Sequence, residues 1–585
     1  MRKLVFDIET DNVDYHKITT IHTIAIYDLE EKKMYSFDRG EVYKGIEMLD
    51  DNLVIGHNIV KYDIPVIQKF YPTFRPKQVV DTMILSTLAF SDIGANDKDV
   101  SRVPSKLKGT HSLKAWGYRL GILKGDFAEK DAWDEWSKEM KEYCIQDVRV
   151  TVKLYNFLKT MHYSKEAIVL EHQVAKIIGR QERYGFYFDI EKAYQLENRL
   201  RTEMEELERK LQEIFPPKKK IVGYYTRPNK KRRIKPGDPK IVIEEFNPGS
   251  RQQIIQRLEE KYGDLNLPST EKGNKQLDDT ILASLPYPEA ELLAKYMLLK
   301  KRLGMLSDGK VAWLKSYNPT THRIHGSVLT NGAVTARMRH QHPNMAQIPA
   351  EKEYRELFRA APGKVLVGVD AKALEFRCFA HRVNDPDYTK VILEGDIHTT
   401  NQQLAGLATR SDAKTFIYAF LYGGGDTKLG SIVNPEASPE QQKKLGAKLR
   451  KKFLQAIPGL EKLTNGIKKQ AKKHGYIVGL DGRHLKVRSL HKALNLLLQS
   501  DGAIVMKKGL TILDRDLRAE GLIPGEDYEF VGNIHDEWQI ETKPELAEKV
   551  AEIAKKAIYK AGVYFGFNCP LAGDAKIGET WAETH

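Results

Sequence analysis

The pattern of apolar residues changes character once along the chain, close to residue 160. Before that point, short runs such as KLVFDIE and NLVIGHN have the length and composition of strands, and they alternate with helical segments such as DIPVIQKFY. After residue 165 the spacing becomes that of amphipathic helices, as in EHQVAKIIGRQERYGF. The sequence therefore predicts an α/β domain over residues 1–160, followed by a different and more helical architecture.

The chain has 585 residues, which is more than one hydrophobic core usually serves. In the second half, a strand-like stretch is predicted at VLVGVDAKALEFRCFAHR and a helix-rich stretch to about residue 480. A hairpin is predicted at YEFVGNIHDEWQIET. We therefore expect the second half to be α+β.

Lysine and arginine outnumber aspartate and glutamate by 93 to 79, and the net charge of +14 favours a polyanionic partner such as nucleic acid. Many cytosolic proteins are mildly basic, so the total alone decides nothing. The segment Pro216–Lys240 is more informative, because it holds ten lysines and arginines against one aspartate and is rich in proline. We predict a basic loop or extended insertion that follows DNA phosphates, with a solvated linker as an equal alternative.

Nothing in the sequence indicates a disulfide framework, a zinc site or a membrane segment. The three cysteines, Cys144, Cys378 and Cys569, are scattered, which suits a reducing cytoplasm. Asp7 and Glu9 interrupt the first apolar run, and no uncharged run reaches the length of a membrane span. We expect a cytoplasmic protein that is neither exported nor embedded in a membrane.

Four carboxylates and a tyrosine in the first domain form one candidate metal site. Asp7 and Glu9 share a face of a predicted strand, so they repel each other unless a cation or solvent offsets their charge. Asp63 and Asp147 come from other elements, and Tyr143 precedes Asp147 by one helical turn. Each aspartate alone is more often a solvated surface charge. As a set, they favour a two-metal site that acts on a phosphodiester.

A second candidate site lies in the other half of the chain. Asp370 ends the apolar run KVLVGVD and Asp536 sits between two β-rich runs, so both can stand at strand ends facing one cleft. Between them, two cations and two tyrosines recur every four residues on a predicted helix: Arg410, Lys414, Tyr418 and Tyr422. Such a stripe suits a nucleoside triphosphate. The plainer alternative is an amphipathic helix with its tyrosines in the core.

The segments VDAKALEFR, RSDAKTFIYAFLYGGG and NIHDE resemble motifs A, B and C of the family A DNA polymerases, in the same order and at similar spacing. The carboxylates of the first domain resemble those of the DEDDy class of 3′→5′ exonucleases. Further segments, among them HSLKAWGYRLGILKGDF, GDIHTTNQ and WAETH, are similar to the replicative polymerases of short-tailed, T-seven-like phages. The resemblance covers nearly the whole chain and implies a template-directed DNA polymerase with a proofreading exonuclease.

This resemblance implies a fold and its boundaries. An α/β ribonuclease-H-like exonuclease domain is expected over residues 1–160, and an α+β right-hand polymerase domain over residues 161–585. Within the latter, the thumb is expected at about 165–330 with the basic insertion at about 216–245, and the fingers at about 385–480. The palm makes up the remainder.

The resemblance also implies roles for individual residues. The exonuclease metal ligands are Asp7, Glu9, Asp63 and Asp147, with Tyr143 orienting the attacking water. The polymerase metal ligands are Asp370, Asp536 and the Ala371 carbonyl, with Glu537 supporting that end of the palm. Glu375 is implied to be the steric gate against a ribose 2′-hydroxyl. Contacts with the primer, its minor groove or the incoming nucleotide are implied for Arg337, His398, Arg410, Lys414, Tyr418, Tyr422, Asn495, Gln499 and His535.

The implied cofactor is Mg²⁺, two ions at each site, with Mn²⁺ as a substitute. The implied partners are primer-template DNA and deoxynucleoside triphosphates, together with a phage helicase-primase and a single-strand binding protein in the cytoplasm of an infected host cell. Two departures from the family pattern matter. Thr335-Ala336-Arg337 replaces the common Thr-Gly-Arg, and the thumb insertion is shorter than the one that binds thioredoxin in T-seven-like enzymes, which makes a thioredoxin clamp doubtful.

Two alternatives remain open from the sequence. A single-subunit RNA polymerase shares the polymerase half of this fold, but Glu375 and the exonuclease motifs argue against it. A non-catalytic DNA-binding scaffold would have degenerate sites, whereas every expected carboxylate is present here.

Overall fold

The computed structural model describes residues 1–97, 102–125, 127, 133–228, 234–269, 273–457 and 459–585. They divide into two compact units. The first comprises Met1–Tyr187 together with His325–His585, and the second comprises Phe188–Ile324. Among the described residues, no helix combines the length and the apolar character needed to cross a membrane.

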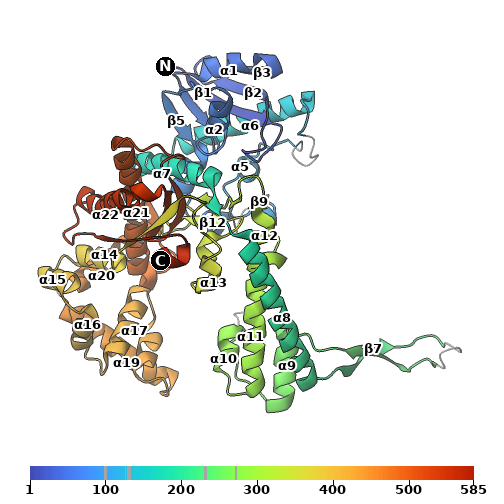
Figure 1. Ribbon diagram of the computed structural model, residues 1–585. Coiled ribbons are helices and arrows are strands. Elements are labelled where there is room, and N and C mark those ends of the chain that lie inside the picture. The colour runs from blue at the N-terminus through green and yellow to red at the C-terminus, as the bar shows by residue number, and fades with distance from the viewer. Residues whose placement is uncertain (98–101, 126, 128–132, 229–233, 270–272, 458) are drawn as a thin grey trace. The chain divides into compact units, whose positions relative to one another are not determined.

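A five-stranded mixed sheet organises the N-terminal part of the first unit (Figure 1). Its order is β3-β2-β1-β4-β5; β1 pairs antiparallel with β2 and parallel with β4, and β4 pairs parallel with β5. The strands are β1 Lys3–Thr10, β2 Ile21–Asp28, β3 Lys33–Asp38, β4 Leu53–Gly56 and β5 Gln78–Asp81. Because β1 is the middle strand, its side chains are held in register from both sides.

Helices pack against this sheet. The longest is α6 (Lys138–Leu158), which contacts β1 and β2 and begins where the Ser137 hydroxyl accepts a hydrogen bond from the Met140 backbone N–H. α1 (Val42–Leu49) contacts β2 and β3. The remaining helices of eight residues here are α2 Asp63–Phe70, α3 Thr82–Ala89 and α5 Leu113–Leu120. The predicted α/β organisation of this region is therefore observed.

A four-stranded antiparallel sheet lies in the second half of the same unit. Its order is β16-β17-β13-β18, formed by Tyr528–Ile534, Glu537–Thr542, Val365–Ala371 and Gly573–Gly578. Helix α22 (Ala547–Tyr564) packs against β13 and β18, and α21 (Ala493–Ala519) packs against α22. Helix α7 (Lys165–Tyr184) contacts both β16 and α21. The predicted hairpin at YEFVGNIHDEWQIET is the pair β16 and β17.

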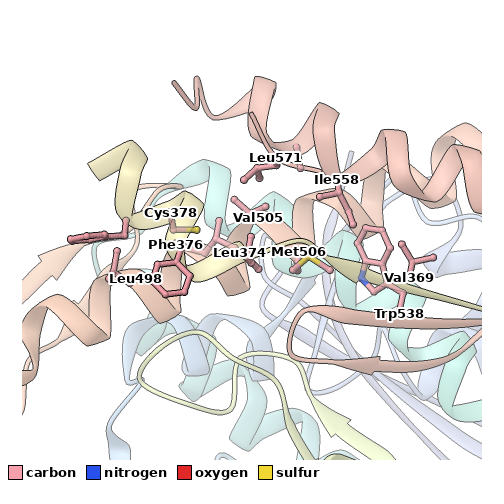
Figure 2. Packing of buried hydrophobic residues seen from close by; sticks show 14 of the residues in the cluster. Val369, Leu374, Phe376, Cys378, Leu498, Val505, Met506, Trp538, Ile558 and Leu571 are labelled. Carbon is pink, nitrogen blue, oxygen red and sulfur yellow. The ribbon is translucent and has the colours of Figure 1, made fainter. Parts of the chain in front are cut away.

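The core of this region joins the sheet to its helices. Figure 2 shows Val369 of β13 and Trp538 of β17 near Met506 of α21 and Ile558 of α22, and all four are buried in one cluster. Trp538 is 1% exposed. Because this hydrophobic core is tightly packed, it holds the ends of β13 and β17 in fixed positions.

The predicted strand-like stretch at VLVGVDAKALEFRCFAHR is wrong in its second half. Strand β13 ends at Ala371, Ala373 has a φ of 47°, and helix α14 runs over Leu374–Val383. The buried positions from Leu374 onward follow helical spacing, which the valines of the preceding strand obscured in the sequence. The helices that follow are α15 Pro386–Glu394, α16 Ile397–Ala405, α17 Arg410–Leu421, α18 Asp426–Val433, α19 Pro439–Ala456 and α20 Leu460–His474.

The second unit is built on long helices. Helix α8 (Ile190–Ile214) packs against α11 (Pro288–Leu303), and the unit also contains α9 (Arg251–Tyr262) and the short helix α10 (Asp279–Ser284). The predicted basic loop proves to be an antiparallel hairpin of β7 (Lys218–Tyr224) and β8 (Pro239–Glu244), which extends from these helices in Figure 1. Its basic cluster at residues 230–233 lies outside the described residues.

Candidate active sites

The first group of carboxylates gathers at the middle strand of the mixed sheet. Asp7 and Glu9 are on β1, Asp63 is the first residue of α2, and Asp147 is on α6. The Ile8 backbone N–H donates a hydrogen bond to Asp63 Oδ1 over 3.3 Å, which joins the start of α2 to β1. Since α6 packs against β1, its carboxylate lies near the other three. Three elements thus bring together the four predicted ligands.

Burial and mutual repulsion raise the pKa values of these carboxyl groups. The pKa of Asp7 is well above its ordinary value, first because the group is desolvated and then because Glu9, Asp63 and Asp147 are close. Burial and then the charge of Asp147 raise the pKa of Glu9 in the same direction. Burial raises the pKa of Asp63 to about 7 and that of Asp147 to about 6. Such a group is stabilised in its ionised form when a cation is bound.

The donor set fits a hard divalent ion. Asp147 Oδ1 is buried without a hydrogen-bond partner among the described residues, and carboxylate oxygens are the ligands that Mg²⁺ and Mn²⁺ prefer. One ligand atom each from Asp7, Glu9 and Cys144 lie within 4.8 Å of one another. Burial raises the pKa of the Cys144 thiol, which donates a hydrogen bond to the Asp7 backbone carbonyl over 3.3 Å. The thiol is thus a neighbour, and the carboxylates are the candidate ligands.

Tyr143 lies one helical turn before Asp147 on α6, as predicted. Burial, followed by the charge of Asp147, raises the pKa of its phenol to about 12. The hydroxyl therefore keeps its proton at neutral pH and can donate a hydrogen bond to a water or a phosphate oxygen.

Sequence reasoning missed Lys124. Its Nζ lies 2.5 Å from Asp147 Oδ2 and 4.7 Å from the centre of the Tyr143 ring. Burial alone would lower the pKa of Lys124, but Asp147, Tyr143 and Asp7 together raise it. Lys124 comes from the loop after α5, so no helical or strand spacing connects it with α6 in the sequence.

The second pair of aspartates lies at one end of the antiparallel sheet. Asp370 is on β13 directly opposite Glu537 of β17, and Asp536 occupies the turn just before β17. The Ala371 backbone N–H donates to the Asp536 carbonyl over 3.0 Å, which fixes the turn against β13. Desolvation, followed by the charges of Asp536 and Glu537, raises the pKa of Asp370 to about 6. These closely spaced carboxylates also fit a hard divalent ion.

Glu537 is buried and held by three donors. Trp581 Nε1 and Gln539 Nε2 each donate to its Oε1 over 2.6 Å, and His585 Nδ1 lies 2.7 Å from its Oε2. These contacts lower the pKa of Glu537 against the effect of burial. The sequence predicted that Glu537 supports this end of the sheet, but it did not reveal these partners.

Helix α17 presents the predicted stripe. Arg410 and Lys414 are exposed, and the Tyr418 and Tyr422 rings are stacked with centres 6.2 Å apart. Arg410 Nε lies 2.7 Å from Asp396 Oδ2, and that aspartate also caps α16. The two cations lie at the N-terminal end of the helix, so this end of the stripe carries the positive charge that phosphates need. The predicted alternative, with both tyrosines in the core, is wrong for Tyr422, which is 45% exposed.

His398 lies beside the stripe on α16. Its ring centre is 6.2 Å from that of Tyr418 and 6.0 Å from that of Phe376. Desolvation and the nearby Arg410 lower the pKa of His398. Its Nδ1 is buried without a hydrogen-bond partner in the part of the chain that the structure describes.

Glu375, in the first turn of α14, is held between two other predicted contacts. Arg337 Nη2 lies 3.2 Å from Glu375 Oε1, and the Tyr422 hydroxyl interacts with the same carboxylate. Burial and Glu375 raise the pKa of Tyr422 to about 12. Just before Arg337, Ala336 is buried with a φ of 61°. Glycine adopts this conformation freely, whereas for alanine it costs roughly 1–2 kcal/mol.

The other residues predicted to contact the primer lie on neighbouring elements. His535 precedes Asp536 in its turn and has a φ of 57°. Its pKa is lowered, first by desolvation and then by the cation of Arg337, so the two are close. Asn495 and Gln499 are half-buried and one turn apart on α21. This helix also packs against α14, the helix that carries Glu375.

Comparison with known proteins gives concordant results. The family described as DNA polymerase family A matches residues 232–583. The chain is 34% identical to the DNA-directed DNA polymerase of Enterobacteria phage T3 and 33% identical to that of Escherichia phage T7, over 100% of this chain and 100% of each relative. It is 26% identical to DNA polymerase I of Aquifex aeolicus, over 95% of this chain and 92% of that protein.

A solved structure also has a similar fold. It is the POL domain of Pol1 from M. smegmatis in complex with DNA primer-template and dNTP, which superimposes with a TM-score of 0.75 at 16% identity. The superposition covers 99% of this chain and 95% of that one.

Proposed function

Because the chain belongs to DNA polymerase family A and is a DNA-directed DNA polymerase, we propose that its two clusters of carboxylates mark two separate active sites. The group of Asp370 and Asp536 extends a primer, and the group of Asp7, Glu9, Asp63 and Asp147 removes nucleotides from a 3′ end. The single observation that supports the first assignment most is the pairing of β13 with β17, which brings Asp370 beside Glu537 and the Asp536 turn.

Primer extension proceeds at the end of the antiparallel sheet. Asp370 and Asp536 would hold the divalent ions that the family uses, with the Ala371 carbonyl as a further ligand. When bound there, two Mg²⁺ ions, or Mn²⁺ in their place, supply Lewis-acid activation of the primer 3′-oxygen and stabilise the leaving pyrophosphate. Arg410 and Lys414 orient the triphosphate by charge-assisted hydrogen bonds. The Arg410–Asp396 ion pair, at 2.7 Å, opens when the phosphates replace Asp396 as the partner of Arg410.

Nucleotide selection uses the side chains between α14 and α17. Glu375 occupies the space next to the sugar and excludes a 2′-hydroxyl, while Arg337 and Tyr422 hold its carboxylate in place. Tyr418 and Tyr422 present their rings to the sugar and base, and His398 contacts the triphosphate from α16. On the primer side, His535, Asn495 and Gln499 contact the terminus and the minor groove, where base-pair shape can be checked without reading sequence.

Proofreading uses the carboxylates of β1, α2 and α6. A mispaired terminus frays and enters this site as a single strand. Tyr143, protonated at neutral pH, orients the water that attacks the terminal phosphodiester. Asp7, Glu9, Asp63 and Asp147 would hold two Mg²⁺ or Mn²⁺ ions, which supply Lewis-acid activation of the water.

The domain boundaries of the family are proposed for this chain as well. Residues 1–160 form the exonuclease, and residues 161–585 form the thumb, fingers and palm. The partners beyond primer-template DNA and deoxynucleotides are a helicase-primase and a single-strand binding protein of a phage, in the cytoplasm of its host. A thioredoxin clamp is not proposed, because the thumb insertion consists, in its described part, of one two-stranded hairpin.

The test of both assignments is a pair of variants in the full chain. Asp370→Asn is expected to abolish extension of a primed template and to leave digestion of a single-stranded oligonucleotide near the wild-type rate. Asp7→Ala combined with Glu9→Ala is expected to do the reverse. Loss of both activities in either folded variant would refute the assignment of two independent sites.

A further inference from the structure

We infer that Lys124 is a positioning residue of the exonuclease site, which holds Asp147 and Tyr143 in their working positions. This inference rests on the proposed exonuclease function. It concerns a loop side chain within the segment HSLKAWGYRLGILKGDF, which contains none of the four carboxylates.

The contacts of Lys124 connect two residues of α6. Its Nζ lies 2.5 Å from Asp147 Oδ2, and it sits over the Tyr143 ring at 4.7 Å from the centre. The side chain is 19% exposed, and that of Asp147 is 3% exposed. An ammonium group in such a partly dry site is a strong hydrogen-bond donor and attracts an aromatic face.

The chain around Lys124 is built to approach Tyr143 closely. A Cβ atom at Gly125 would lie 3.1 Å from Cδ2 of the Tyr143 ring, so glycine allows the backbone to pack against that ring. The Phe127 ring is tilted against the same tyrosine, with its centre 5.9 Å away. Lys124 is therefore held next to α6 by its own neighbours, and its ion pair is part of a packed contact.

The geometry leaves one oxygen of Asp147 available. Lys124 occupies Oδ2, whereas Oδ1 is buried without a partner among the described residues. An aspartate held by one oxygen presents the other in a fixed direction, which is what a metal ligand needs. The lysine also lies close enough to offset the charge of all four carboxylates.

Two substitutions separate the charge of Lys124 from its bulk. Lys124→Met keeps an unbranched chain of similar length without the ammonium group, and Lys124→Arg keeps a cation. Lys106→Met, at an exposed lysine in the same region, is the matched control. Digestion of a single-stranded oligonucleotide is measured as kcat and KM, and primer extension by the same preparations reports that the chain is folded.

We expect Lys124→Met to lower kcat for digestion by about 100-fold, because small displacements of reacting groups have effects of this size. KM for the oligonucleotide, primer extension and the Lys106→Met control should stay near wild type, and Lys124→Arg should recover most of the activity. Wild-type digestion by Lys124→Met would overturn the inference alone. No digestion by the wild-type chain would overturn the proposed exonuclease, and this inference with it.

A double variant and a binding measurement distinguish positioning from collapse of the site. If Lys124 acts through Tyr143, Lys124→Met should lower kcat for digestion by a smaller factor in a Tyr143→Phe background than in the wild type. If the double variant instead shows the product of the two single-variant factors, the two residues are not coupled.

Mn²⁺ binding is titrated by electron paramagnetic resonance in chains that also carry Asp370→Asn and Asp536→Asn. Affinity close to that of the Lys124 parent supports positioning, because the four carboxylates then stay together and only the alignment of Asp147 and Tyr143 is lost. Markedly weaker binding would show that Lys124 only maintains the fold of the site.

Discussion

Arg337 Nη2 donates a hydrogen bond to Glu375 Oε1 over 3.2 Å, and so connects the segment before β12 (Arg339–Gln341) with the first turn of α14. Tyr422, at the end of α17, is near enough that Glu375, after burial, raises the pKa of its phenol. The Arg337 contact therefore fixes where the Glu375 carboxylate lies, with the Tyr422 phenol near it. A side chain fixed in this way can exclude a substituent by its position, which a freely rotating carboxylate could not do.

Glu375→Ala is expected to raise incorporation of ribonucleotides relative to deoxynucleotides by about tenfold or more, because it removes the atoms that fill the space of the 2′-hydroxyl. Glu375→Gln is the control, since it keeps the volume and removes the charge. Single-nucleotide kcat/KM for matched ribo- and deoxynucleotides measures the change. Unchanged selectivity in Glu375→Ala would mean that another residue is the gate.

Tyr418→Phe is expected to weaken chain termination by dideoxynucleotides by about tenfold, the effect of removing one hydrogen bond of about 1.4 kcal/mol. The reason is that the hydroxyl of Tyr418 can take the place of the missing 3′-hydroxyl. Tyr422→Phe is the control, because it removes a hydroxyl from the ring stacked on Tyr418. Equal termination by Tyr418→Phe and wild type, in a sequencing-ladder assay, would reject this role.

Trp581→Phe should lower the free energy of unfolding by about 1–3 kcal/mol, because it removes a donor from the buried carboxylate of Glu537. Primer extension should fall with it, while oligonucleotide digestion should not. Trp116→Phe is a matched control: both indoles are 2% exposed, but Trp116 Nε1 has no hydrogen-bond partner among the described residues. Thermal unfolding compares the two variants, and equal shifts would argue against a special role for the Trp581 contact.

Replacing the basic residues 230–233 with serine should shorten the products made per binding event and leave single-nucleotide insertion near normal. Each DNA phosphate that the hairpin no longer neutralises should reduce the log-log salt slope of duplex binding by roughly 0.9. Lys192→Ser, at an exposed lysine of α8, is the control. If the slopes measured by titration of primer-template DNA are identical, the basic residues 230–233 belong to a linker. A large increase in product length with added thioredoxin would show that even this short insertion binds a thioredoxin clamp.

Exposed apolar side chains on the hairpin were not expected from its charge. Ile221, Val222, Ile241, Val242 and Ile243 are each about half exposed or more. The lysines of Pro216–Lys240 dominated the sequence pattern and led to the prediction of a loop. Two short apolar runs, at residues 221–222 and 241–243, were the signal for strands.

The family and fold class could be predicted from the sequence. The order of polymerase motifs is confirmed by the match to DNA polymerase family A and by relatives that align over the whole chain. That assignment also rejects the single-subunit RNA polymerase. The boundary of α14 was missed, because an apolar strand runs almost directly into a helix whose first residues are again partly apolar, and composition alone does not separate them.

What the sequence determined by itself is local. The alternation along β1 put Asp7 and Glu9 on one face, and a spacing of four put Tyr143 above Asp147 on α6 and aligned Arg410, Lys414 and Tyr418 on α17. Periods of this kind follow from backbone geometry, so they can be read without knowing how the chain packs.

Only the tertiary structure decided which distant groups meet. Lys124 reaches Asp147 from a loop, Asp396 holds Arg410 from the start of another helix, and His585 and Trp581 contact Glu537 from the C-terminal end of the chain. No spacing rule links these residues, because their proximity depends on how whole elements pack and not on the repeat of any one of them. The fine geometry of both candidate sites depends on such contacts, and a sequence pattern gives the ligands without the partners that orient them.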